Sequence, residues 1–245
     1  MRLLGRWFVL VLLAGALLQL FFVGRIALMV VVDPQSTAFQ RTEAARILRE
    51  KGQLRWRQEW VPYAQISDHL KRAVIASEDD GYSNHDGVDW EALEKAWERN
   101  ARAEAQAQRR AAVAPAGKPV RGPKIVGGST ITQQLAKNLL LSGERTLLRK
   151  GQELVLTLLL ETLLDKQRIL EIYLNNVEWG EGVFGAEAAS QHYYRKSASK
   201  LTAYEAARLA VMLPRPRYFE KLPKSGYLSS RASTIVARMR EAQLP

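Results

Sequence analysis

The sequence predicts a mainly α-helical protein, in which a single N-terminal transmembrane helix carries one helical domain with little β-structure. An apolar run opens the chain, between residues 7 and 32. In much of the remainder, apolar residues recur at spacings of three and four, which is the period of a helix with one buried face. The strand signal is slight and falls on a short patch at residues 54–61.

Composition limits the classes of protein that this chain can belong to. A length of 245 residues suits one membrane-tethered domain. The absence of cysteine excludes a disulfide scaffold, cysteine-ligated zinc, iron–sulfur clusters and thiol catalysis. Lys and Arg outnumber Asp and Glu by 36 to 25, for a net charge of +11. Such a charge points to anionic partners, which are nucleic acid, a membrane surface or a phosphorylated substrate.

The apolar run at residues 7–32 is long enough to cross a bilayer as a helix. Before Arg25, Gln19 is its only strongly polar residue, and Arg25 can extend to the headgroups. A cleaved signal peptide is the alternative interpretation. No small-residue cleavage site follows the apolar stretch, so we expect a retained anchor.

Charges at the start of the chain predict its orientation. Arg2 and Arg6 precede the apolar run, and the positive-inside rule therefore places residues 1–6 in the cytoplasm as a short stub. Arg25 argues weakly for the opposite orientation. We expect a single-pass protein of the inner (cytoplasmic) membrane, with everything after the anchor in the periplasm. Genomic DNA is not available there, so nucleic acid is not an expected partner.

Beyond the anchor, residues 33–53 are expected to be a juxtamembrane linker that includes an early helix at 42–51, and residues 54–245 to be the functional domain. Two helices carry capping boxes at their starts, in which Thr130 is followed by Gln133 and Thr202 by Glu205. The periodicity predicts domain helices at 68–77, 90–112, 131–141, 147–164, 166–176, 203–213 and 229–241.

A basic insertion at about residues 99–126 interrupts the domain. From Arg99 to Lys124 it carries seven basic residues and one acidic residue, Glu104. Its second half has the Pro and Gly content typical of a mobile loop. The charge run is either a solvated face or a surface that contacts lipid headgroups.

The predicted helix at 147–164 is apolar nearly all round. Its polar residues fall in one sector of the helical wheel: Arg149, Lys150, Glu153, Thr157 and Glu161. A helix this apolar belongs in a core, so that sector should face a cleft, a partner helix or a ligand.

Two carboxylates are candidates for chemistry. Glu78 closes an apolar helix and begins a Gly- and Asn-rich turn, and Glu153 lies in the polar sector described above. Two carboxylates in one cleft are the minimum for acid–base work at a sugar centre. The alternative is that Glu153 forms only an ion pair with Arg149, four residues earlier.

Two polar clusters are candidates for binding. Basic and amide side chains fall between two helices joined by a short turn, where they either bind a pyrophosphate or form a cationic surface. These are Gln134, Lys137, Arg145, Arg149 and Lys150. The acidic loop after Glu78 is either a cation site or an ordinary polar loop. Its residues are Asp79, Asp80, His85, Asp86 and Asp89.

Four strings, in this order, resemble the four signatures of the glycosyltransferases that polymerise peptidoglycan (glycosyltransferase family 51). They cover about residues 54–219. The first is Glu78-Asp79-x-x-Tyr82-x-x-His85-x-Gly87-x-Asp89, and the second is GGSTITQQLAKN from Gly127. The third is Arg145-x-x-x-Arg149-Lys150-x-x-Glu153 with Leu160-Glu161, and the fourth is Lys166-x-x-Ile169-Leu170-Glu171-x-Tyr173-Leu174-Asn175 with Gly180. With one anchor and no further domain, the chain is similar to monofunctional members rather than to bifunctional class A penicillin-binding proteins.

The resemblance implies a lysozyme-like helical fold and a set of site residues. Glu78 would be the catalytic base and Glu153 the second essential carboxylate. The pyrophosphate of the substrate would be bound by Lys137, Arg145, Arg149 and Lys150, with Gln134 and Ser129 nearby. Supporting positions would be Asp79, His85, Thr130 and Glu161. The chain departs from the family pattern in having Tyr82 where Phe is commoner, and in the length of its basic insertion.

The activity implied is polymerisation of lipid II into β-1,4 glycan strands, with inversion at C1 and release of undecaprenyl pyrophosphate. The expected partners are lipid II, the growing lipid-linked glycan, membrane lipids, and proteins of cell division or cell-wall synthesis. No dedicated metal cage is visible in the sequence, so a Mg²⁺ or Mn²⁺ ion would be recruited with the pyrophosphate. Two alternatives remain: a lysozyme-like enzyme that cleaves glycan, and a non-catalytic scaffold that binds lipid II.

Overall fold

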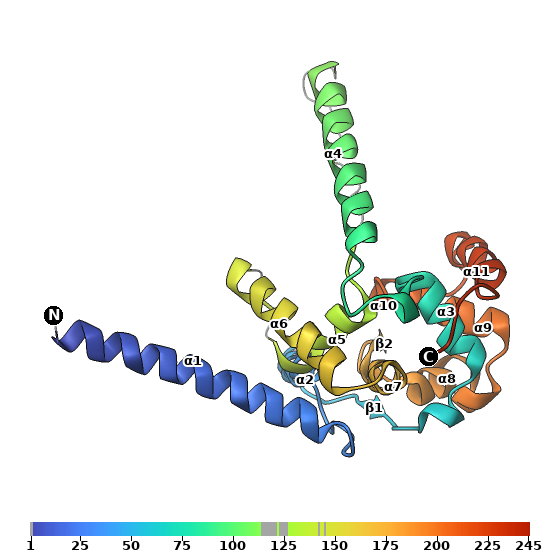
Figure 1. The fold of residues 1–245 in the computed structure, drawn as a ribbon. Helices are drawn as coiled ribbons and strands as arrows, with labels where there is room; N and C mark the ends of the chain where they lie inside the picture. The colour runs from blue at the N-terminus through green and yellow to red at the C-terminus, as the bar shows by residue number, and fades with distance from the viewer. Residues whose placement is uncertain (1, 114–121, 123–126, 142, 145) are drawn as a thin grey trace.

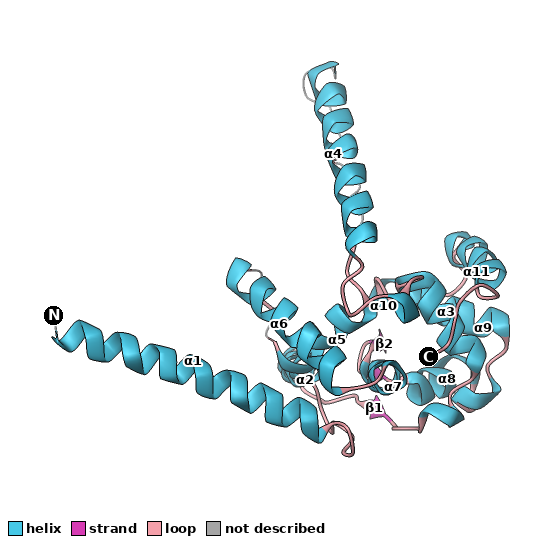
Figure 2. Cartoon of the chain, viewed as in Figure 1, coloured by secondary structure: helices cyan, strands magenta, loops and turns pink. Residues whose placement is uncertain are grey.

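The computed structural model describes residues 2–113, 122, 127–141, 143–144 and 146–245 (Figure 1). Helices dominate the described chain, and Figure 2 shows strands only as short segments beneath them. The helices are α1 (Arg2–Leu28), α2 (Ala38–Lys51), α3 (Asp68–Glu78), α4 (Trp90–Val113), α5 (Ile131–Leu140), α6 (Leu147–Leu163), α7 (Lys166–Asn176), α8 (Ala186–Tyr194), α9 (Ala203–Met212), α10 (Pro216–Glu220) and α11 (Gly226–Arg238). The mainly α-helical prediction is confirmed.

Helix α1 extends away from the folded domain (Figure 1). Within the described residues it supplies one segment, Leu4–Leu28, that is long and apolar enough to span a membrane. Residues 4–18 of the helix are exposed, whereas Phe22 and Ile26 near its C-terminal end, and Met29 just after it, are buried. The single helical anchor predicted from the sequence is therefore present as a continuous helix that docks at its C-terminal end.

Residues 33–53 do more than link the anchor to the domain. Helix α2 fills most of this range and begins at a capping box between Thr37 and Gln40. Ile47 is buried, and α2 packs on α5. The domain therefore starts earlier than residue 54. The sequence pattern missed this because α2 is polar overall and buries few apolar side chains.

Two groups of helices build the core. Helices α3, α9 and α11 pack against one another, and α5 packs against α2, α6 and α7. Helix α3 begins at Ser67, whose hydroxyl accepts a hydrogen bond from the backbone N–H of His69, and it buries Leu70 and Val74 on one face. This arrangement brings the C-terminal end of α3 beside the N-terminal half of α5.

The sheet of the described chain is small, with the strand order β1-β3-β2. Strand β1 (Arg57–Gln58) lies within the predicted β-prone patch and pairs in parallel with β3 (Val183–Phe184). Strand β2 (Glu178–Gly180) pairs antiparallel with β3 through a turn at Gly182, where φ is +72°. A Cβ there would lie 2.1 Å from the carbonyl oxygen of Arg55, so this turn requires glycine.

Helix α4 projects from the domain (Figure 1) and leaves Trp90 and Trp97 largely exposed. It covers the first part of the basic insertion expected at about 99–126, which is helical as far as Val113. Of the rest of the expected mobile loop, residues 114–121 and 123–126 lie outside the described residues.

Candidate active site

Glu78 is the last residue of α3, and its side chain is largely withdrawn from water. Its Oε2 accepts a hydrogen bond of 2.9 Å from Nε2 of Gln134 on α5. Burial raises the pKa of the Glu78 carboxyl above its ordinary value, and the neighbouring Asp79 charge adds to this. The Gln134 hydrogen bond and the charge of Lys137 oppose the rise. A carboxyl tuned in this direction is a better proton acceptor than an exposed one.

A second hydrogen bond fixes the orientation of the Gln134 amide. The hydroxyl of Tyr173, on α7, donates to Oε1 of Gln134 over 2.9 Å. Because a phenol proton must go to the carbonyl oxygen, the NH₂ group of Gln134 is directed at Glu78. The Tyr173 side chain is buried, which raises its pKa well above the ordinary value, so this donor keeps its proton.

Asp79 joins the end of α3 to the start of α5. One carboxylate oxygen accepts the backbone N–H of Ile131 at 2.9 Å, and the other lies 2.8 Å from Nε2 of His85. Thr130 caps α5 through the predicted capping box and also donates to the carbonyl of Gly87 at 2.6 Å. Asp79, His85 and Thr130 therefore hold the loop after Glu78 in place, and no hydrogen bond joins them to the Glu78 carboxyl.

Glu153 lies on α6 and is 3% exposed. Its two oxygens face two cations of the same helix, Nη1 of Arg149 at 2.9 Å and Nζ of Lys150 at 2.5 Å. The ion pair that the sequence left open is thus formed. A buried carboxylate paired with two cations fixes their positions, so the pairing is compatible with a role in holding an anion.

A cavity of about 470 Å³ is lined by a partner of each carboxylate, although neither Glu78 nor Glu153 itself lines it. Gln134, the partner of Glu78, and Arg149, the partner of Glu153, both line it, together with Lys137. Nε of Arg149 is buried and has no hydrogen-bond partner among the described residues. The Nε–H group of Arg149 is thus an available hydrogen-bond donor, and Lys137 adds a positive charge to the cavity wall. Such a cavity is suited to a phosphate-bearing ligand.

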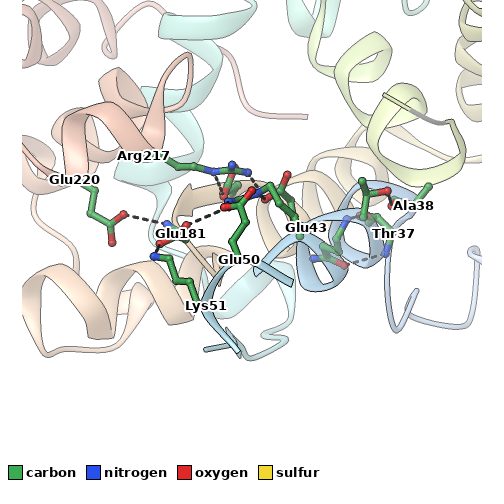
Figure 3. A network of polar contacts seen from close by, with 12 residues as sticks. Thr37, Ala38, Glu43, Glu50, Lys51, Glu181, Arg217 and Glu220 are labelled. Atoms are coloured by element: carbon green, nitrogen blue, oxygen red, sulfur yellow. Dashed lines mark hydrogen bonds and ion pairs between the residues drawn. The ribbon is translucent and has the colours of Figure 1, made fainter. Parts of the chain in front are cut away.

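The opposite wall of this cavity is acidic, and sequence reasoning missed it. Glu43 of α2 and Glu178 of β2 line it, and both are 7% exposed. Arg217 of α10 bridges them, at 2.8 Å from Glu178. It lies 2.5 Å from Glu43, a contact seen in Figure 3. Burial raises the pKa of Glu178, against the effect of Arg217. The only signal in the sequence was the local spacing of Glu43 and Arg46, which also form an ion pair.

The other predicted site residues have different surroundings. Glu161 accepts a hydrogen bond from Thr132 at 2.6 Å and pairs with Lys166 at 2.8 Å, so it fastens α6 to α5 and α7. Ser129 is exposed beside the cap of α5 and makes no hydrogen bond with the described residues. Arg145 lies outside the described residues.

Three of the four carboxylates of the acidic loop considered as a cation site have protein partners, and the fourth, Asp86, is exposed. Asp79 is engaged as above, Asp80 pairs with Arg238 at 2.9 Å, and Asp89 accepts the backbone N–H of Ala92 at 2.8 Å. Among the described residues, no group of three or more His, Asp or Glu side chains is arranged to hold a metal ion.

Comparison with known proteins identifies the family. The sequence model of the transglycosylase family matches residues 45–240. The biosynthetic peptidoglycan transglycosylase of Herminiimonas arsenicoxydans is 50% identical over 240 residues, which cover 98% of this chain and 96% of that protein. The biosynthetic peptidoglycan transglycosylase of Burkholderia thailandensis is 53% identical over 234 residues, covering 95% of this chain and 84% of that protein. The chain belongs to the transglycosylase family.

Proposed function

We propose that this chain is a membrane-anchored peptidoglycan glycosyltransferase that polymerises lipid II into β-1,4 glycan strands and releases undecaprenyl pyrophosphate. Family membership over residues 45–240 supports the reaction class. The observation that carries the assignment of roles is that Gln134, the hydrogen-bond partner of the partly buried Glu78, lines the same cavity as the cationic residues Lys137 and Arg149.

In this mechanism Glu78 acts as the general base. It removes the proton from the 4-hydroxyl of the acceptor sugar, and that oxygen attacks C1 of the lipid-linked donor. The C1–O bond to the pyrophosphate breaks, so an α-linked donor gives a β-linked product in one displacement with inversion. The raised pKa of Glu78 supports this role, because a base works best when its pKa lies nearer the working pH.

The leaving group needs charge neutralisation more than it needs a proton. A pyrophosphate is weakly basic, so cations directed at its oxygens stabilise the transition state as charge develops there. Arg149 and Lys137 line the cavity, and Lys150 shares Glu153 with Arg149. Glu153 holds these cations in position. Arg145 is proposed to join them on the strength of its place in the third signature alone.

A Mg²⁺ or Mn²⁺ ion is proposed to arrive with the pyrophosphate, because no three His, Asp or Glu side chains of the described residues are arranged to hold it beforehand. In this scheme EDTA lowers the rate of polymerisation and added Mg²⁺ restores it. An unchanged rate after complete chelation contradicts the recruited ion.

The orientation in the membrane follows from charge. Arg2 and Arg6 precede the span, so we place the N-terminus in the cytoplasm of the cell and the domain on the periplasmic side of the inner membrane. The test fuses to each end of the chain, in turn, a reporter enzyme that is active only after export from the cytoplasm. Activity of the reporter at the N-terminus contradicts this orientation.

The decisive experiment supplies the full chain with two substrates. With lipid II, glycan lengthens in the proposed function; with purified sacculi, release of muropeptides indicates a lytic enzyme instead. Glu78→Gln keeps the acceptor for Gln134 but removes the base, so we expect polymer formation to fall by about 10²–10⁴-fold with lipid II binding retained. Asp80→Asn is the matched control, since Asp80 is an exposed neighbouring carboxylate that pairs with Arg238. Normal polymerisation by Glu78→Gln refutes the role of the base, and binding without polymerisation by the wild type indicates a scaffold.

A further inference from the structure

Helix α1 presents one continuous stripe to the domain. Gln19, Phe22, Ile26 and Met29 follow one another at spacings of three and four residues, and the last three are buried. Gln19 is the only strongly polar residue between positions 7 and 23, and it lies on this docked stripe while its neighbour Leu20 is 65% exposed. An amide placed on the docked face of an apolar span requires a partner there.

That partner is Gln152 of α6, and the contact is reciprocal. Nε2 of Gln19 donates to Oε1 of Gln152 over 2.8 Å, and Nε2 of Gln152 donates to Oε1 of Gln19 over 3.2 Å. Each amide therefore satisfies a donor and an acceptor of the other. The two residues are 133 positions apart in sequence, so the pair ties the anchor directly to α6.

The pair occurs at the part of α6 that carries the cationic residues. Gln152 precedes Glu153 directly and follows Arg149 and Lys150 within one turn. On other sides of α6, apolar side chains are exposed around it, including Leu148 at 87% and Val155 at 42%. Gln19 and Gln152 are both partly buried, and the exposed side chains that follow on α6, Leu154 and Val155, are apolar, so each amide depends on the other for its hydrogen bonds.

A second contact fixes the outer end of α1. Nε of Arg168 donates to the carbonyl of Met29 at 2.8 Å, and its guanidinium pairs with Asp33 at 2.7 Å and with Glu171 at 2.8 Å. Gln19 lies about 15 Å further along the helix axis than Met29. With the outer end held by α7, contact at Gln19 sets the direction of α1 against α6.

We infer that Gln19 and Gln152 are a pair of positioning residues, through which the membrane anchor holds the N-terminal half of α6, with Arg149, Lys150 and Glu153, in its substrate-binding position. This inference rests on the proposed function for its kinetic consequences. In a protein whose binding-competent conformation is populated only in part, the apparent affinity falls by that fraction while the bound state is unchanged. We call the pair of Gln19 and Gln152 the clasp. Its loss therefore raises KM for lipid II and leaves kcat within about 2-fold of the wild-type value.

The test is a double-mutant cycle on the full chain in nanodiscs. Gln19→Leu and Gln152→Leu each raise KM by about 3- to 30-fold, the range expected for one interhelical hydrogen-bonded pair in a membrane. The double variant raises KM no further than either single one, because both remove the same contact. Fully additive effects, an unchanged KM, or a loss confined to kcat overturns the inference.

A composition-matched control separates position from polarity. Gln19→Leu combined with Leu20→Gln keeps one amide in the anchor but directs it at lipid, so it should behave like Gln19→Leu alone. Recovery of the wild-type KM by this swap overturns the inference.

A distance measurement tests the clasp without depending on catalysis. The chain has no cysteine, so Leu13→Cys and Leu158→Cys, at exposed positions on α1 and α6, accept spin labels selectively. The wild-type background gives a narrow distance distribution, and Gln19→Leu broadens it; an unbroadened distribution overturns the clasp. If the wild-type chain makes no polymer, the proposed function fails while this measurement still decides the inference.

Discussion

Tyr173→Phe tests whether the orientation of one amide controls the catalytic base. The substitution keeps the buried ring but removes the hydroxyl that donates to Gln134. Loss of one such hydrogen bond lowers the free energy of unfolding by about 1 kcal/mol, which lowers the melting temperature of a chain this long by about 2–4 °C. The amide of Gln134 is then free to turn its oxygen toward Glu78, so the donor that stabilises the carboxylate is lost part of the time.

The consequence for Glu78 has a definite sign. The Gln134 hydrogen bond opposes the rise that burial causes in the pKa of this carboxyl. Weakening that bond raises the pKa further, so the base is protonated at a higher pH and the acid limb of kcat/KM moves to higher pH. Above that limb the rate should approach the wild-type value, because Glu78 itself is unchanged.

The assay is the pH profile of lipid II polymerisation, measured alongside thermal unfolding. Tyr193→Phe is the matched control: its hydroxyl donates to the carbonyl of Trp179 at 2.7 Å, away from Glu78. It should lose similar stability without moving the acid limb. An acid limb that stays in place in Tyr173→Phe, or moves equally in both variants, refutes the reasoning.

Three further predictions concern stability. Arg217→Ala leaves two buried carboxylates without their shared cation and should lower the free energy of unfolding by about 3 kcal/mol in urea titration, whereas a loss below 1 kcal/mol contradicts the bridge. Gly87→Ala places a Cβ 2.7 Å from the Thr157 methyl group at a φ of +82°, and should lower the free energy of unfolding by about 2–4 kcal/mol. The control is Gly52→Ala, where φ is +68° but the space is open, and the loss should be only about 1–2 kcal/mol. Equal losses in the two variants argue against the clash at Gly87. Glu78→Gln should melt at a higher temperature than the wild type at neutral pH, because a carboxyl with a raised pKa destabilises the fold once it is charged. This difference in melting temperature should vanish as the pH falls below the ordinary Glu pKa. A difference that grows on acidification contradicts the raised pKa.

Local patterns predicted most of the helices, because their causes lie within a few residues. The capping boxes at Thr130 and Thr202 occur as expected, and the apolar period placed α6 and α7 within one residue at each end. Of the predicted polar sector of α6, Arg149 lines a cavity, whereas Glu161 faces the partner helices α5 and α7. Strand β1 was foreseen only as a patch, since two paired residues leave almost no periodicity.

Contacts between distant segments could not be read from periodicity. The bridge from Glu43 to Arg217 and the amide pair of Gln19 and Gln152 both join residues that are more than a hundred positions apart. The same limit applies to Gln134, whose role depends on Tyr173 as much as on its own helix. A single sequence carries no record of such pairs, because each partner looks like an ordinary polar residue in its own segment.

The contact between Asp79 and the first N–H of α5 constrains how the cleft can move. Glu78 and Asp79 are consecutive, so the proton acceptor travels with the helix that carries Gln134 and Lys137. Any widening that admits a bulky glycolipid must therefore leave this contact between α3 and α5 intact and displace other walls of the cavity. During such opening, the reacting hydroxyl would meet the same amide and the same lysine on every turnover. A glycan chain could then move through the site between additions while the groups that react with it keep a fixed geometry.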